Sequence, residues 1–152
     1  MTCNKKTMKS INMRALLSSI LKQGPISQKQ LFENSSLDKC TISVLINELK
    51  GQGFLTMTGS GDASVLGGRK PQFMELEKEK ITALGVVLRD RKLIFSLYNL
   101  KGTALWKDEI ALKEVVSTEW APAIIKSIGI VENLCSEKGY IFLGTGFAIG
   151  CY

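Results

Sequence analysis

The chain contains no histidine, and this absence removes several kinds of chemistry. Histidine is the usual general base near neutral pH and the usual partner of serine or cysteine nucleophiles, so enzymes built on those pairs are excluded. Cys3, Cys40, Cys135 and Cys151 are scattered, form no C-x-x-C pair and have no histidine to complete a metal site. Such cysteines are typical of free thiols in a reducing compartment. Carboxylate-based catalysis stays open, but we expect no enzyme, no cofactor and no metal ion.

Long hydrophobic runs are also missing. No stretch approaches the ~18 consecutive apolar residues of a membrane span, and the basic start of the chain is not followed by the apolar segment of a secretory signal. With 45% hydrophobic and 22% charged residues among 152, the composition is that of an ordinary globular protein. We therefore expect a cytoplasmic protein with no membrane partner, built as one medium domain or two small ones.

Acidic residues are scarce in one half of the chain. Residues 1–76 contain ten basic and five acidic residues, a net charge of +5, whereas residues 77–152 contain ten and nine, a net charge of +1. Positive charge concentrated in one region suggests an anionic partner, most commonly DNA. A solvated basic surface would give the same charge.

Three helices are predicted in the basic half. The first covers residues 10–23 and ends at a glycine-proline pair. The second begins at Ser27, whose spacing from Gln30 is that of a capping box. The third runs from an N-cap at Asp38 to about Lys50. This order of elements is typical of a helix-turn-helix.

The third helix has two contrasting faces. Its apolar stripe of Ile42, Leu45, Ile46 and Leu49 is predicted to face the core. The candidates for contact with DNA are Lys39, Cys40, Thr41, Ser43, Val44 and Asn47. In a major groove, asparagine can pair with adenine and an apolar group can touch a thymine methyl. An ordinary exposed face of a three-helix bundle is the alternative.

A basic, glycine-containing loop follows between two predicted strands, residues 54–58 and 72–76. We interpret it as the wing of a winged helix-turn-helix. The candidate contacts are Gly67, Gly68, Arg69 and Lys70. Arginine beside glycine can enter a narrow minor groove, where the negative potential is strong. A flexible surface loop is the alternative.

The second half is predicted to have the order β-β-β-α-β. The expected strands are residues 81–88, 93–100, 103–112 and 140–149, with a helix over residues 118–138. Because only one helix is available, we expect one face of the sheet to be bare. The predicted fold class is α+β: a disordered basic tail over residues 1–9, a winged helix-turn-helix over residues 10–76, and the β-β-β-α-β unit over residues 80–152.

Several motifs resemble the N-terminal part of the ROK family, named for repressors, open reading frames and kinases. They are Ile11-Asn12, Gly24-Pro25-Ile26-Ser27, residues 37–43, Asn47-Glu48-Leu49, Gly53-Phe54-Leu55 and Gly67-Gly68-Arg69-Lys70-Pro71. The resemblance covers residues 9–76 well and residues 81–150 more loosely. It implies that the first domain binds operator DNA. It also implies that the second half begins an actin-like (ribonuclease H-like) domain, which in the family binds a sugar or sugar phosphate and mediates assembly.

The kinases of the family carry a D-x-G-x-T phosphate loop in the first hairpin of that domain. The matching segment, residues 87–91, lacks both the first carboxylate and the glycine. The family's catalytic aspartate, acidic sugar-binding motif and cysteine-rich zinc motif all lie downstream of the part matched here. We therefore expect an incomplete effector domain and carry over no sugar site.

These observations lead to one leading interpretation. We expect a sequence-specific DNA-binding regulator, a repressor of sugar-utilisation genes, that binds double-stranded operator DNA as a homodimer at the nucleoid. A protein-interaction module and a non-functional fragment of a longer regulator are the alternatives. A sugar-kinase fragment is the least favoured, because of the residues missing from segment 87–91.

Overall fold

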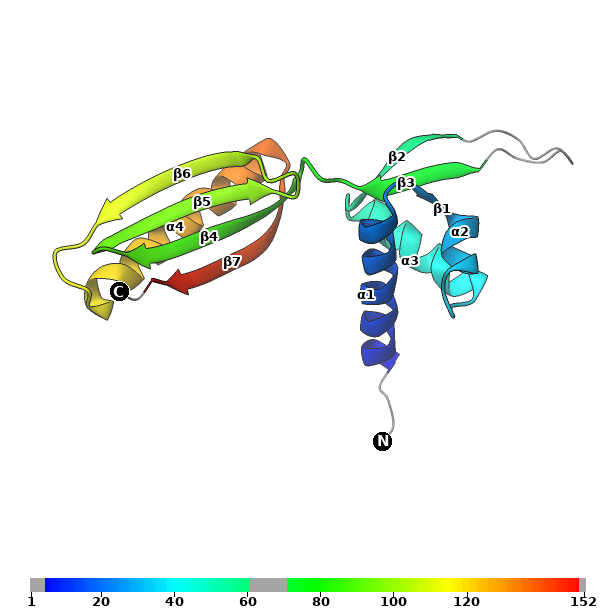
Figure 1. The fold of residues 1–152 in the computed structure, drawn as a ribbon, viewed down its shortest axis with the longest axis horizontal. Helices are drawn as coiled ribbons and strands as arrows, with labels where there is room; N and C mark the ends of the chain where they lie inside the picture. Colours follow the sequence, from blue (N-terminus) through cyan, green and yellow to red (C-terminus); the bar gives the residue numbers. More distant parts are fainter. Residues whose placement is uncertain (1–4, 61–70, 151–152) are drawn as a thin grey trace, which may run out of the picture. The chain divides into compact units, whose positions relative to one another are not determined.

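The computed structural model describes residues 5–60 and 71–150 (Figure 1). The chain divides into two compact units, Met1–Glu77 and Lys78–Tyr152, each with its own buried core. The fold class is α+β, as expected from the sequence.

The first unit is a winged helix-turn-helix. Its helices are α1 (Lys5–Gln23), α2 (Gln28–Glu33) and α3 (Lys39–Gly51), and its strands are β1 (Ile26–Ser27), β2 (Leu55–Ser60) and β3 (Gln72–Leu76). The three strands form an antiparallel sheet in the order β1-β3-β2. Helices α2 and α3 make the helix-turn-helix, while β2 and β3 are the strands on either side of the predicted wing.

Side-chain caps explain why α2 and α3 begin where they do. The backbone N–H of Gln30 donates to Ser27 Oγ at 3.3 Å, and the backbone N–H of Ser27 donates to Gln30 Oε1 at 2.9 Å. This is the predicted capping box, and Asp38 likewise caps α3 as predicted. The sequence did not reveal that Ile26 and Ser27 also pair with Met74 and Phe73 as strand β1. A two-residue strand has no pattern of its own and exists only because β3 lies beside it.

The start of α1 differs from the expectation. The helix begins at Lys5, so residues 5–9 are helical and the predicted disordered tail over residues 1–9 is wrong for this part. No glycine or proline interrupts the segment. Lys9 Nζ also lies 2.7 Å from Glu48 Oε2 on α3, which ties this early turn to the rest of the unit.

The capping box provides a test of the first unit's stability. Ser27→Ala should lower its free energy of unfolding by about 1 kcal/mol, because a side-chain acceptor for a helix N-terminus is lost. Urea unfolding followed by circular dichroism measures this change. Ser18→Ala, at an exposed position inside α1, is the control and should be neutral or slightly stabilising. Equal stability of Ser27→Ala and the unsubstituted chain would show that the cap contributes nothing.

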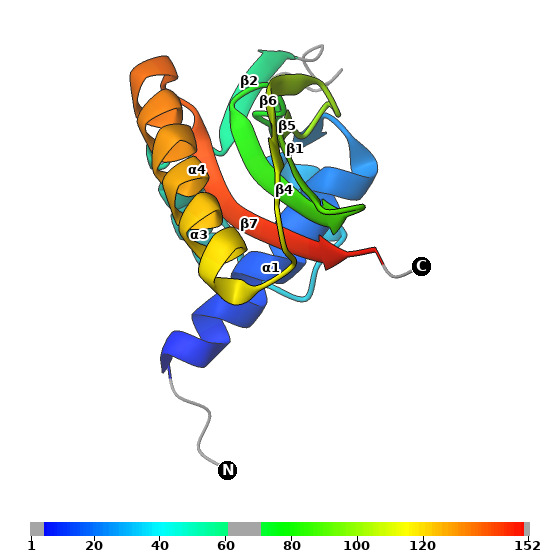
Figure 2. The same ribbon diagram turned by 90° about the vertical axis from the view of Figure 1, so that its left-hand side faces the viewer.

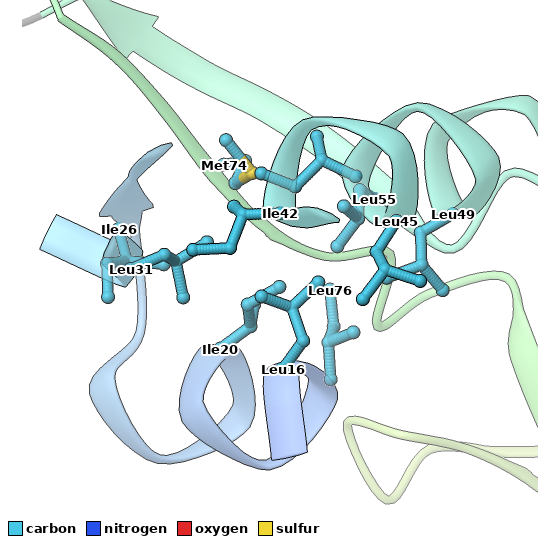
Figure 3. Close-up of a cluster of buried hydrophobic side chains, with 11 residues drawn as sticks. Leu16, Ile20, Ile26, Leu31, Ile42, Leu45, Leu49, Leu55, Met74 and Leu76 are labelled. Carbon is cyan, nitrogen blue, oxygen red and sulfur yellow. The ribbon is translucent and has the colours of Figure 1, made fainter. Parts of the chain in front are cut away.

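Side chains from all three helices and the sheet meet in one core (Figure 3). Its buried members are Leu16, Ile20, Ile26, Leu31, Ile42, Leu45, Ile46, Leu49, Leu55, Met74 and Leu76. The stripe predicted on α3 is confirmed, since all four of its residues are at most 2% exposed. Four buried anchors on one helix fix its rotation about its own axis. The core therefore decides which side of α3 faces outward.

The second unit is a four-stranded sheet with one helix. Its elements are β4 (Ile81–Arg89), β5 (Lys92–Asn99), β6 (Ala104–Ala111), α4 (Ser117–Lys138) and β7 (Ile141–Ile149), which confirms the β-β-β-α-β order. The strand order is β6-β5-β4-β7, with β7 parallel to β4 and the other pairs antiparallel. Helix α4 lies along one face of the sheet (Figures 1 and 2).

The two faces of this sheet are unequal. Alternate residues of β4 and β5, including Leu84, Val86 and Phe95, are buried against α4 together with Val131. The residues between them point to the other face, where Tyr98 is 40% exposed. Within this unit, no second helix of the described residues covers that face, in agreement with the sequence analysis.

The hairpin that matches the phosphate loop of family kinases is tight. Only Asp90 and Arg91 separate β4 from β5, with φ angles of 51° and 58°. Both lie in the left-handed region, the geometry of a two-residue turn that matches the twist of a hairpin. Two residues with side chains occupy a turn in which a phosphate loop would use glycine to bring its backbone close to the ligand.

Candidate nucleic-acid interface

The outer face of α3 presents three of the six predicted contacts without obstruction. Cys40, Val44 and Asn47 are exposed, and Val44 is 62% exposed despite being apolar. Among the residues that the structure describes, none forms a hydrogen bond with the Asn47 side chain. Its amide therefore keeps both its donor and its acceptor available for a base edge.

Thr41 has a different position. Its backbone N–H donates to Asp38 Oδ1 at 2.9 Å, and its hydroxyl donates to Asp38 Oδ2 at 2.6 Å. The hydroxyl proton is therefore used in the cap of α3 and is not available to donate to DNA. The Thr41 side chain is half-buried.

The same contacts hold Asp38 in its charged form. The Thr41 hydroxyl, followed by the Thr41 backbone N–H, lowers the pKa of Asp38 below its ordinary value of 3.8. A carboxylate whose folded pKa is lowered stabilises the fold above its ordinary pKa, and this contribution is lost as pH falls through the lowered value. At neutral pH the charge also lies favourably at the positive end of the α3 dipole.

Lys39 and Ser43 connect α3 to α2. Lys39 Nζ lies 4.8 Å from the centroid of the Phe32 ring, a cation–π contact. Ser43 Oγ accepts a hydrogen bond of 2.9 Å from Gln28 Nε2. Sequence reasoning missed Gln28. The angle between α2 and α3 brings it to Ser43, and that angle has no signature in the spacing of residues.

An open hollow of about 390 Å³ lies between α2 and α3. It is lined by Gln28, Lys29, Phe32, Glu33, Lys39 and Ile42. The aromatic and aliphatic side chains are flanked by two lysines, of which Lys29 pairs loosely with Glu33 at 3.8 Å. Lysines at the edge of the helix-turn-helix are suited to contact the phosphate backbone of a nucleic acid.

The predicted wing contacts Gly67, Gly68, Arg69 and Lys70 lie outside the described residues. The structure gives the strands that lead to them. β2 and β3 pair from Leu55–Leu76 to Ser60–Gln72, with an irregularity between Met57 and Gly59.

Across the described residues, no helix has both the length and the apolar character needed to cross a membrane.

No family model matches the chain. Over 149 residues, it is 31% identical to a Caldicellulosiruptor protein named "Putative xylose repressor", a match that covers 94% of this chain. Over 96 residues, it is 32% identical to the xylose repressor of Bacillus subtilis, covering 63% of this chain. A solved structure of a ROK-family transcriptional regulator, homologous to the Escherichia coli MLC protein, superposes with a TM-score of 0.72 over 93% of this chain, at 19% identity.

The resemblance to the ROK family is confirmed. The structural match shows that both units of the chain share the fold of a ROK-family regulator. The chain spans 36% of the Caldicellulosiruptor protein, 24% of the Bacillus protein and 36% of the solved structure. The resemblance to the ROK family therefore covers nearly all of this chain but only about a third of such a regulator.

Proposed function

We propose that this ROK-like chain is a sequence-specific DNA-binding transcriptional regulator, a repressor of sugar-utilisation genes. The observation that carries the proposal is the outer face of α3, where an exposed Val44 stands beside the free amide of Asn47. A valine on that face can contact a thymine methyl in a major groove. The relatives named as xylose repressors support the direction of control and the sugar context.

The proposed binding mode divides the work between two elements. Helix α3 enters the major groove, where Asn47 pairs with an adenine and the small side chains of Cys40 and Ser43 allow close approach. The wing places Arg69 in the adjacent minor groove, where it responds to groove width. Lys39 and Lys70 contribute charge toward the phosphates.

Selection from a pool of random duplexes tests this function directly. After several rounds of binding and amplification, the chain should enrich one motif that contains two inverted half-sites about one helical turn apart. Asn47→Ala, carried through the same selection, should lose the preference at one position of each half-site. A pool that stays random with the unsubstituted chain would refute sequence-specific binding.

We also propose that the chain acts as a homodimer formed through its second unit. Among the described residues, β7 is an edge strand of nine residues without a charged side chain, and Phe147 and Ile149 on it are 45% and 63% exposed. The opposite edge strand, β6, carries Lys107, Asp108 and Glu109. Charged side chains discourage pairing at a sheet edge, so the two edges differ in the way expected if β7 meets a partner strand. A second copy of β7 is the occupant we propose, because a two-fold pair of edges matches the two-fold symmetry of an operator.

Light scattering at micromolar concentration should therefore give the mass of a dimer. Ile149→Lys should shift the chain toward monomer, because a lysine on the edge strand opposes strand pairing. Ile125→Lys is the matched control, since Ile125 is 71% exposed on α4, and it should remain dimeric. A monomer for the unsubstituted chain, or equal behaviour of the two variants, would contradict this interface.

A further inference from the structure

Two polar side chains from different helices are joined on the outer surface of the helix-turn-helix. Gln28 is the first residue of α2 and Ser43 lies in the middle of α3, fifteen residues further along the chain. Gln28 Nε2 donates to Ser43 Oγ at 2.9 Å, and this contact is exposed. Water competes for an exposed hydrogen bond, so the pair contributes little to stability. Its position on the surface is its more informative property.

The pair lies on the face of α3 that we propose enters the groove. Ser43 follows Cys40 by three residues and precedes Asn47 by four, so the three side chains share one side of the helix. Gln28 reaches this side of α3 from α2. Its backbone is held on one side by the capping residue Ser27, which is 5% exposed, and the same short helix is anchored by the buried Leu31. Because the start of α2 is held in place in this way, the Gln28 amide has a fixed position on the outer face of α3, the side shared by Cys40, Ser43 and Asn47.

The chemistry left over after pairing suits a base edge. The Gln28 amide has two N–H donors and one acceptor oxygen, and Ser43 occupies one donor. The second N–H and Oε1 form the donor–acceptor pair that matches adenine N6 and N7. The Ser43 hydroxyl keeps its proton for an acceptor on the same or the neighbouring base.

We propose that Gln28 is a specificity-determining residue outside α3, which reads one base pair jointly with Ser43. This inference rests on the proposed DNA-binding function. It adds a contact from α2 to an interface that the sequence located on α3 and the wing alone. The Gln28–Ser43 hydrogen bond would orient both side chains in the free protein, and this preorganisation lowers the entropy cost of binding DNA.

A double-mutant cycle tests the pair. Affinities are measured for the unsubstituted chain, Gln28→Ala, Ser43→Ala and the double variant, on the selected duplex and on a panel with each base pair changed in turn. Each single variant should lose about five- to a hundredfold in affinity on the selected duplex and relax discrimination at the same position. The double variant should bind about as well as the weaker-binding single variant, because either single substitution already removes the joint contact with the base pair.

Lys29→Ala is the matched control, since Lys29 is the next residue of α2 and exposed. It should weaken binding to all duplexes alike and leave discrimination unchanged. Gln28→Glu provides a second variant of nearly the same size. It removes both donors, so it should also relax discrimination at that position, and circular dichroism should show an unchanged fold for each variant.

The possible outcomes distinguish a failure of joint reading by Gln28 and Ser43 from a failure of sequence-specific DNA binding. If the unsubstituted chain selects a motif but Gln28→Ala keeps full affinity and discrimination, the joint reading is wrong and the proposed function stands. Additive losses at two different positions would likewise overturn the joint reading. If the unsubstituted chain selects no motif, both the function and the inference fail.

Discussion

Val44→Glu is expected to reduce the affinity for duplex DNA at least about a hundredfold without changing the fold. Val44 is 62% exposed and has no buried role, so the substitution leaves the core of the first unit intact. In a groove, however, the new carboxylate would lose its water close to the negative phosphates and would have no cation to compensate it. Fluorescence anisotropy with a labelled duplex measures the loss.

A valine in the second unit supplies the control. Val115 lies between β6 and α4 and is 52% exposed, so Val115→Glu adds the same charge to the same chain at a comparable exposure. It should change affinity only through the small effect of net charge. If both variants bind equally well, α3 does not enter the groove through this face.

The second large effect concerns salt. Affinity for any duplex should fall by roughly three orders of magnitude or more between 50 and 200 mM salt, if about six or more phosphates are neutralised. The physical reason is the release of condensed counterions when lysine and arginine replace them. The chain has the necessary charge, since its net charge is +6 and most of it lies in the first half.

The slope of log affinity against log salt concentration measures the number of contacts. Lys39→Ala should reduce that slope by about one for each copy bound, whereas Lys126→Ala, on α4, should leave it unchanged. Binding that does not depend on salt would exclude DNA as the partner and favour the interpretation as a protein-interaction module.

Much of the fold could be predicted because its signals are local. The Ser27–Gln30 capping box, the Asp38 cap and the four-residue stripe on α3 each depend on residues within one or two helical turns. The β-β-β-α-β order followed from alternating patterns and turn residues in the same way. The start of α1 was misplaced, although no glycine or proline interrupts residues 5–9, and the contact of Lys9 with Glu48, far away in sequence, could not be read from spacing.

The sequence by itself determined the order of elements in the two units, the helix that we propose for the DNA groove and the resemblance to the ROK family. These properties are carried by caps, periodicity and motifs, which act over a few residues. Only the tertiary structure decided that β1 exists and that Gln28 reaches Ser43. Each depends on the packing of elements distant in sequence, and the angles and separations at which elements pack are set by the whole core.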